Sequence, residues 1–236
     1  MQTTDQAARI AGAIYLLAIV LSPFSLIYVP NVIVVTGNAT ATVANIMRHE
    51  ALFRLGILGD LVAGTVILFL TFALYRLFKR VDQDLAAMVV VLGGLIPCAI
   101  YFVNSLNWIA ALILAGGADY LSVFTRAQQD ALAMLFMQLH SQGHLVSLVF
   151  AGLWLFPFGV LVIRSGFLPR LLGVWLIAGG FGWLVLTWAG LFAPQYQERI
   201  LTFGQPLFFG EIAITLWLLV VGAKVRPFAV KAKTPS

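Results

Sequence analysis

Six apolar runs dominate the sequence, and each is interpreted as a membrane-spanning helix. About 20 helical residues cross the roughly 30 Å of hydrocarbon in a bilayer. The runs cover residues 10–29, 52–74 and 85–115, a segment that ends at residue 163, and residues 168–192 and 207–221. Unpaired backbone groups cannot face lipid, and these runs lack the period-two alternation of barrel strands, so helices are predicted throughout.

The composition excludes a single soluble core. Of the 236 residues, 61% are hydrophobic and 10% are charged, whereas a soluble domain carries about 25% charged residues. A surface that faces lipid accommodates this excess, because the outside of the protein is then as apolar as its interior. Residues 1–226 are therefore predicted to form one all-α integral membrane domain, a bundle of six transmembrane helices embedded in the lipid bilayer.

The distribution of Lys and Arg predicts how this bundle is oriented. Ten of the fourteen basic residues lie at one set of span ends and four at the other. The larger set comprises Arg9, Arg76, Lys79, Arg80, Arg164, Arg170, Lys224, Arg226, Lys231 and Lys233, and the smaller set Arg48, Arg54, Arg126 and Arg199. Because basic residues concentrate on the cytoplasmic side, both termini are predicted to be cytoplasmic. The predicted location of the chain is the plasma (inner) membrane of a bacterium.

The segments outside the spans are short on the predicted cytoplasmic side and longer on the outer side. Residues 227–236 read as a basic cytoplasmic tail without fixed structure. The outer loops at residues 30–50 and 116–130 are each predicted to hold a short interfacial helix. The basic residues form no single patch of the kind that phosphate binding requires, so nucleic acid is excluded as a partner.

Polar residues inside the spans share a common depth. Counting from the cytoplasmic ends at about 1.5 Å per residue places Asp60 and Glu211 roughly 20–24 Å up, and Asn104 and His144 about 30 Å up. A charge at mid-bilayer costs about 2.5–3.5 kcal/mol on insertion scales, so such residues usually have a function. We predict a ligand-binding pocket in the outer half, formed by Arg54, Asp60, Asn104, Asn107, His140, His144 and Glu211. Alternatively, helix ends simply meet the interface there, which explains Asn107 and His140 better than Asp60 and Glu211.

Three states are open to the two buried acids, Asp60 and Glu211. Each is protonated and neutral, or paired with Arg54, or bound to a cation. Arg54 and Asp60 are six residues apart, which is roughly 120° around a helix and about 9 Å along it. They do not share one face, so a direct pair requires the full reach of the arginine.

His140 and His144 are spaced as two ligands of one metal ion. Residues four apart share a helix face, as in the two-histidine helix of zinc proteases. The glutamate that follows the first histidine in those enzymes is absent, because Ser141 stands there. His49 falls in the same outer layer. One hypothesis is therefore a transition metal such as zinc, held by His49, His140 and His144. The further oxygen ligand would come from Glu50, Asp60 or Glu211. Ordinary hydrogen-bonded histidines at the interface are the alternative.

Four stretches carry a resemblance to a known family. They are ARIAG at residues 8–12, EALFRLGILGD at 50–60, GFLPRLLGVWLIAGG at 166–180, and Gly210-Glu211-Ile212 leading to Trp217. With these, nearly the whole chain resembles the bacterial "domain of unknown function 4386" family of six-span membrane proteins. The resemblance implies the six-span topology and supplies neither an activity nor catalytic residues.

Three functions are compatible with these observations. The first is a protein that binds or transports a small ligand or ion in the outer-half pocket. The second is a metal-dependent membrane enzyme, a lipid-directed hydrolase or an oxidoreductase, that uses His140 and His144. The third is a structural or assembly subunit without a ligand of its own, in which the polar residues serve packing alone.

Overall fold

The computed structural model describes residues 4–223, and this part of the chain is helical without any strand. The predicted tail at residues 227–236 lies outside the described residues. Six helical units are long and apolar enough to cross a membrane, which confirms the predicted number of spans. They run over Thr4–Ile33, Glu50–Phe78, Gln83–Gly116, Arg126–Arg164, Arg170–Phe192 and Pro194–Val221.

Several units are built from more than one helical segment. The first consists of α1 (Thr4–Pro23), η1 (Phe24–Tyr28) and α2 (Val29–Ile33), and the second is α4 (Glu50–Phe78). The third joins α5 (Gln83–Val90), η2 (Val91–Leu95) and α6 (Ile96–Gly116), and the fourth joins α7 (Arg126–Leu153) to α8 (Leu155–Arg164). The fifth is α9 (Arg170–Phe192), and the last comprises η4 (Pro194–Tyr196), α10 (Gln197–Leu216) and η5 (Trp217–Val221).

Three of these segments, η1, η2 and η5, are single wide π turns. A π turn inserts one extra residue into a helix and often occurs at functional sites. At η1 the turn stands between two prolines, since Pro23 precedes it and Pro30 follows at the start of α2. The missing N–H of Pro30 therefore falls where the regular hydrogen-bond ladder is already interrupted, and the first span continues beyond its predicted end at residue 29.

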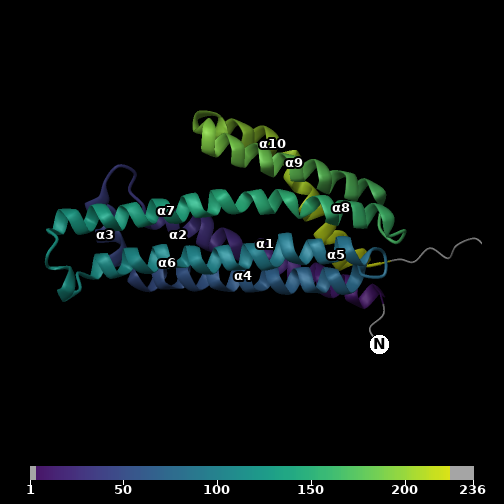
Figure 1. Ribbon diagram of the computed structural model, residues 1–236, viewed down its shortest axis with the longest axis horizontal. Coiled ribbons are helices and arrows are strands. Elements are labelled where there is room, and N and C mark those ends of the chain that lie inside the picture. The colour runs from purple at the N-terminus through teal and green to yellow at the C-terminus, as the bar shows by residue number, and fades with distance from the viewer. Residues whose placement is uncertain (1–3, 224–236) are drawn as a thin grey trace, which may run out of the picture.

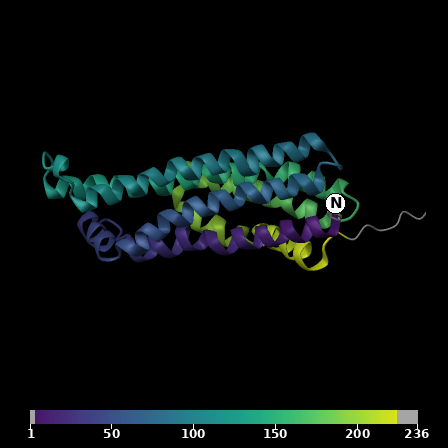
Figure 2. The same cartoon turned by 90° about the horizontal axis from the view of Figure 1, so that it is seen from below.

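The ends of the described chain lie together at one end of the bundle (Figure 1). The backbone N–H of Ala223 donates to the Asp5 carboxylate at 3.1 Å, and α1 packs along η5, as Figure 2 also shows. An even number of spans places the two ends of the described chain on one side of a membrane. Which side that is remains a prediction from the basic residues, so we refer below to the termini end and to the opposite, α3 end.

At the α3 end, the two long loops differ in structure. The first contains α3 (Ala39–Arg48), whose first turn is capped by Asn38 and which buries Thr42, Val43 and Ile46. The second contains only a single 3-10 turn, η3 (Asp119–Leu121). The fourth unit has 39 residues, about 58 Å of helix, which exceeds the roughly 30 Å of hydrocarbon. A unit of this length is longer than the apolar layer is thick.

Two apolar clusters make up the core. One lies toward the termini end, around Phe78, Phe158 and Leu176. The other lies toward α3, around Phe53, Trp108 and Met137. Along α4 and α7, the buried polar residues Asp60, His140 and Ser147 lie in the interval between these two clusters. The α9–α10 pair diverges from α7 toward its tip (Figure 1).

Candidate metal centre

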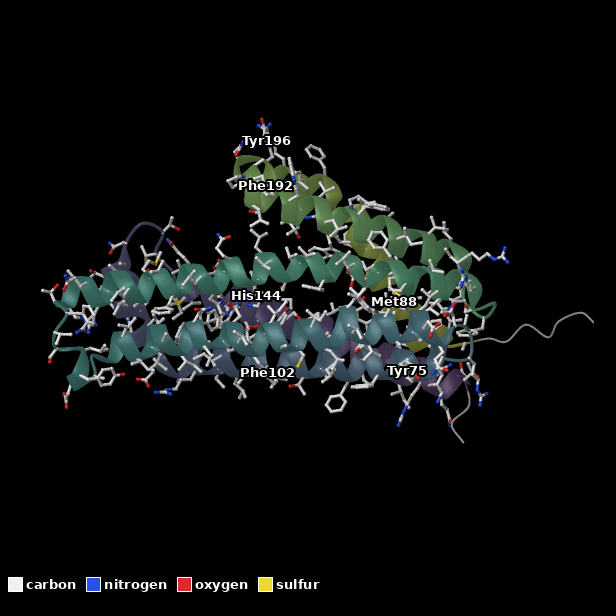
Figure 3. The ribbon with its side chains drawn as sticks, viewed as in Figure 1. Tyr75, Met88, Phe102, His144, Phe192 and Tyr196 are labelled. Atoms are coloured by element: carbon white, nitrogen blue, oxygen red, sulfur yellow. The ribbon has the colours of Figure 1, made fainter. Side chains whose placement is uncertain are left out.

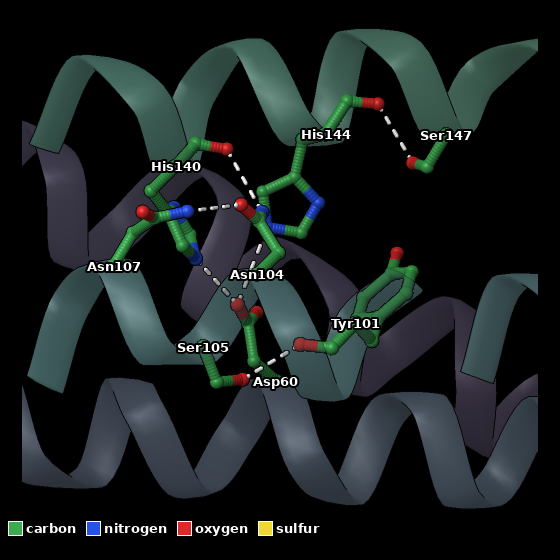
Figure 4. Close-up of polar contacts among 8 residues, drawn as sticks. All are labelled: Asp60, Tyr101, Asn104, Ser105, Asn107, His140, His144 and Ser147. Atoms are coloured by element: carbon green, nitrogen blue, oxygen red, sulfur yellow. Dashed lines mark hydrogen bonds and ion pairs between the residues drawn. The ribbon is translucent and has the colours of Figure 1, made fainter. Parts of the chain in front are cut away.

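Asp60 of α4 and two histidines of α7 meet in the bundle interior (Figure 4). One carboxylate oxygen of Asp60, Oδ2, lies 2.7 Å from Nε2 of His140 and 3.2 Å from Nε2 of His144. The exposed fraction is 0% for Asp60, 3% for His140 and 15% for His144. One ligand atom from each residue lies within 4.8 Å of the others, so the three could hold a metal ion.

Small residues on α4 allow the neighbouring helix to approach this site. Gly56 and Gly64 stand one turn before and one turn after Asp60, on the same helix face. A Cβ atom at Gly56 would lie 2.7 Å from the ring of Trp108, and one at Gly64 would lie 3.0 Å from the Cβ of Tyr101. Because both positions are glycine, α6 packs closely on α4, and these aromatic rings flank Asp60.

The same two rings hold the imidazoles in place. Trp108 stacks on His140, with ring centroids 4.1 Å apart and an angle of 24° between the planes. Tyr101 meets His144 edge-on, with a centroid distance of 5.1 Å. The imidazoles are nearly perpendicular to each other, at 76° and 4.6 Å. Each imidazole ring therefore presents its Nε2 atom to the same carboxylate oxygen, Oδ2 of Asp60.

An asparagine pair links α6 to the histidine helix. The amide nitrogen of Asn104 donates to the backbone carbonyl of His140 at 2.9 Å, and Asn107 donates to the Asn104 side-chain oxygen at 2.9 Å. Gly143 faces Asn104 directly, and any Cβ at that position would collide with the Asn104 amide. The predicted residues Asn104 and Asn107 thus support the histidine helix and form no hydrogen bond with Asp60.

Replacing Gly143 with Ala is expected to displace the Asn104 amide. We expect the free energy of unfolding in detergent to fall by about 1 kcal/mol, because the two hydrogen bonds of the Asn104 amide weaken while the helix propensity of α7 improves. Gly116→Ala is the matched control, since nothing lies within 4 Å of a Cβ there. Equal stability of the two variants would contradict this account of Gly143.

The residues present fit a divalent transition metal. Bonds of about 2.0–2.1 Å in a tetrahedral site put neighbouring ligand atoms roughly 3.3 Å apart. The observed separation of 3.2 Å between Asp60 and His144 matches this spacing, and the 2.7 Å between Asp60 and His140 requires a widening. The other carboxylate oxygen, Oδ1 of Asp60, is buried and has no hydrogen-bond partner. Such an atom costs free energy unless something occupies its lone pairs.

Two other predicted site residues lie away from this group. Arg54 pairs with Glu50 one turn earlier on α4, at 2.7 Å, and not with Asp60. His49 lies at the junction of α3 and α4, eleven residues before Asp60, which is about 16 Å along the helix. It is therefore not part of the group formed by Asp60, His140 and His144.

Glu211 on α10 belongs to a second polar site. Its Oε2 accepts a hydrogen bond from the Tyr15 hydroxyl at 2.5 Å, and its Oε1 accepts one from the Trp183 indole at 2.7 Å. These residues line a cavity of about 510 Å³ to which all six units contribute. The structure thus distributes the predicted polar residues between a histidine–aspartate group and a cavity with Glu211.

Tyr101 and Ser147 connect the two sites. Both line the cavity, while Tyr101 contacts the His144 ring and Ser147 donates to the His144 carbonyl at 2.7 Å. In Figure 3, His144 points from α7 into the bundle, near the level of Phe192 at the tip of α9. The centre therefore lies deep between the helices, toward the α3 end.

The aromatic members of both sites were not predicted as site residues. A signal existed for two of them, because Tyr101 and Trp108 stand three residues before and four residues after Asn104, on one face of α6. No comparable spacing marks Tyr15 or Trp183, which reach Glu211 from different spans. Their roles follow only from how the helices pack.

Comparison with known proteins places the chain in a family without assigning an activity. An uncharacterized protein from Archaeoglobus fulgidus is 32% identical over 80 residues, which is 33% of this chain and 44% of that protein. The match thus spans less than half of that relative's length. No solved structure matches the chain significantly. The chain matches the family described as "Domain of unknown function (DUF4386)" over residues 10–222, and it therefore belongs to this family.

Proposed function

We propose that this membrane protein binds a divalent transition metal ion, with zinc as the best fit, through Asp60, His140 and His144. The observation that carries the proposal is the convergence of two imidazole nitrogens on a fully buried carboxylate whose second oxygen has no partner. This ion would be the ligand of the pocket predicted in the outer half of the bundle. We place that half on the extracytoplasmic side of a bacterial inner membrane, on the strength of the basic residues.

The ligand set favours zinc over magnesium or calcium. Imidazole nitrogen suits zinc, copper, iron and nickel, whereas Mg²⁺ and Ca²⁺ prefer sites made of oxygen atoms. Two histidines and one carboxylate recur in zinc sites, and a fourth position then remains for water or another ligand. The partly exposed His144, next to the cavity, lies on the side where such a ligand would enter.

Metal analysis of the purified protein tests this proposal. The protein is purified without chelators and then dialysed against buffer that contains zinc. We expect about one bound zinc ion per chain. His144→Ala is expected to lose the ion, because two remaining ligands hold zinc poorly. His49→Ala is the matched control and is expected to retain it, since His49 lies outside the group.

Two results would overturn the proposal. One is a wild-type protein that takes up no transition metal, and the other is a His144→Ala variant that binds as much as the wild type. Either result would favour the third hypothesis, in which Asp60, His140 and His144 form a hydrogen-bonded structural group. Equal loss on His49→Ala would instead require a site that includes His49.

A metal-dependent hydrolase acting on a lipid-borne ester is the second candidate function. The observation in its favour is Tyr101, which touches His144 and also lines the apolar cavity. A zinc site with an open position activates water for attack on a carbonyl group. The purified wild-type and His144→Ala proteins also test for this activity. Hydrolysis of short-chain esters by the wild type that is abolished in His144→Ala would support an enzyme. Metal uptake without turnover would leave binding as the function.

A further inference from the structure

The cavity beside Glu211 is a site of its own. It measures about 510 Å³ and is bordered by every one of the six units, within the roughly 300–1,000 Å³ of small-molecule pockets. Among the described residues that line it, Glu211 is the only charged one, and none is Lys, Arg or His. A cavity of this size far exceeds what a bare metal ion needs, so an organic ligand is the occupant to consider.

Two hydrogen-bond donors from other spans converge on the carboxyl group of Glu211. Each carboxylate oxygen accepts one bond, from the Tyr15 hydroxyl at 2.5 Å and from the Trp183 indole at 2.7 Å. Hydroxyl donors approach ionised carboxylates at about 2.5–2.7 Å. A carboxylate offers roughly four lone-pair positions, so these two bonds leave acceptor capacity. None of the ion pairs of the described residues includes Glu211.

Aromatic rings surround this carboxyl group. The cavity wall includes Tyr15, Tyr101, Trp154, Trp183 and Phe208. Trp183 packs against Phe208 with a centroid distance of 4.2 Å, and Tyr15 packs against Trp154 at 5.9 Å. Aromatic faces attract cations, most strongly when the cation has lost its water. We propose that the cavity binds a lipophilic organic cation, such as a quaternary ammonium or phosphonium compound, with Glu211 as its counter-ion.

Access from the lipid fits a ligand of this kind. Leu26, Ile27 and Ile212 line the cavity and are also 37%, 58% and 41% exposed on the apolar surface of the bundle. Leu26 and Ile27 belong to the π turn η1, which widens the first span at this point. A cation with apolar substituents enters a bilayer readily, whereas a strongly hydrated inorganic cation does not. The proposal is independent of the metal centre, because neither His140 nor Asp60 lines the cavity.

Binding of tetraphenylphosphonium tests the proposal, with tetraphenylborate as a probe of similar shape and opposite charge. The chain is reconstituted in nanodiscs, equilibrium dialysis measures both ions, and protein-free nanodiscs provide the background. We expect the wild type to bind the phosphonium ion and to exclude the borate. Glu211→Gln keeps the shape and removes the charge, so it is expected to weaken phosphonium binding by at least about tenfold.

Two further variants keep the test decisive if Glu211→Gln folds poorly. Phe208→Leu removes one aromatic wall without touching the bonds of Glu211, and it should weaken binding by about threefold to tenfold. Glu50→Gln removes an acid that pairs with Arg54 away from the cavity, and it should bind as the wild type does. No phosphonium binding, equal binding of both ions, or unchanged binding by Glu211→Gln would overturn the proposal. An unchanged zinc content in Glu211→Gln would show that the two sites are separate.

Discussion

Saturating zinc is expected to raise the free energy of unfolding of the wild-type protein and to leave the Asp60→Asn variant unchanged. At a zinc concentration about 1,000-fold above the dissociation constant, the increase is about 4 kcal/mol, because the ion binds the folded state only. Unfolding curves in detergent, recorded with zinc and with a chelator, measure the difference. This increment compares each protein with itself, so it does not depend on the baseline stability of the variant.

Asparagine is the informative replacement at this position. It has nearly the shape of aspartate and retains one oxygen that can accept a bond from either histidine, but it carries no charge and is a poor zinc ligand. In the presence of chelator, the wild type and Asp60→Asn should therefore differ by less than the zinc increment. A purely structural role for Asp60 predicts the opposite, namely no response to zinc and a loss of stability under both conditions.

Asp82→Asn provides the matched control at the termini end. Asp82 caps the first turn of α5 through the Leu85 N–H and pairs with Arg164 at 2.9 Å. The substitution is chemically the same as Asp60→Asn. Because Asn also caps helices well, only the exposed ion pair is lost. We expect a small change in baseline stability and a full zinc increment. Loss of the increment in this variant would mean that zinc acts elsewhere.

The six spans were predictable because hydrophobic length alone determines them. The residues at which the helical units begin and end were harder to predict, because a helix can continue through polar residues and proline. The fourth unit begins at Arg126, where Thr125 and Gln128 cap each other, although its first turns are not apolar. The first unit extends to Ile33 because Pro30 falls just after a π turn. In both cases local hydrogen bonding extends a helix that hydropathy would end.

The site was predictable only in part. Counting along a span gives the depth of a residue in the membrane, but it does not tell which neighbouring helix the side chain faces. The spacing of His140 and His144 places both on one face of α7, so their proximity followed from the sequence. The choice of Asp60 over Glu211 as their partner depends on which helix faces them. That is decided by the close approach of α6 to α4 at Gly56 and Gly64, which no single-span pattern encodes.

Replacing Gly173 with Ala is expected to lower the free energy of unfolding by about 3 kcal/mol, the upper part of the range for overpacking. A Cβ at Gly173 would lie 2.5 Å from the Gly159 carbonyl oxygen, and a Cβ at Gly159 would lie 2.6 Å from the Gly173 carbonyl oxygen. Backbone meets backbone here, so no side chain can rotate away, and α8 must separate from α9. Unfolding curves in detergent measure the loss, and Gly116→Ala should show none.

The response of Gly173→Ala to zinc also tests whether helix packing and metal binding are separate. Because Gly173 lies in the α8–α9 contact and not at the metal centre, the weakened bundle should still gain the full zinc increment. Asp60→Asn should show the reverse, with near-normal packing and no increment. A bundle that served only as an assembly subunit would lose stability in Gly173→Ala and would show no zinc effect in either protein. The pair of variants therefore separates helix packing from ligand binding within one measurement.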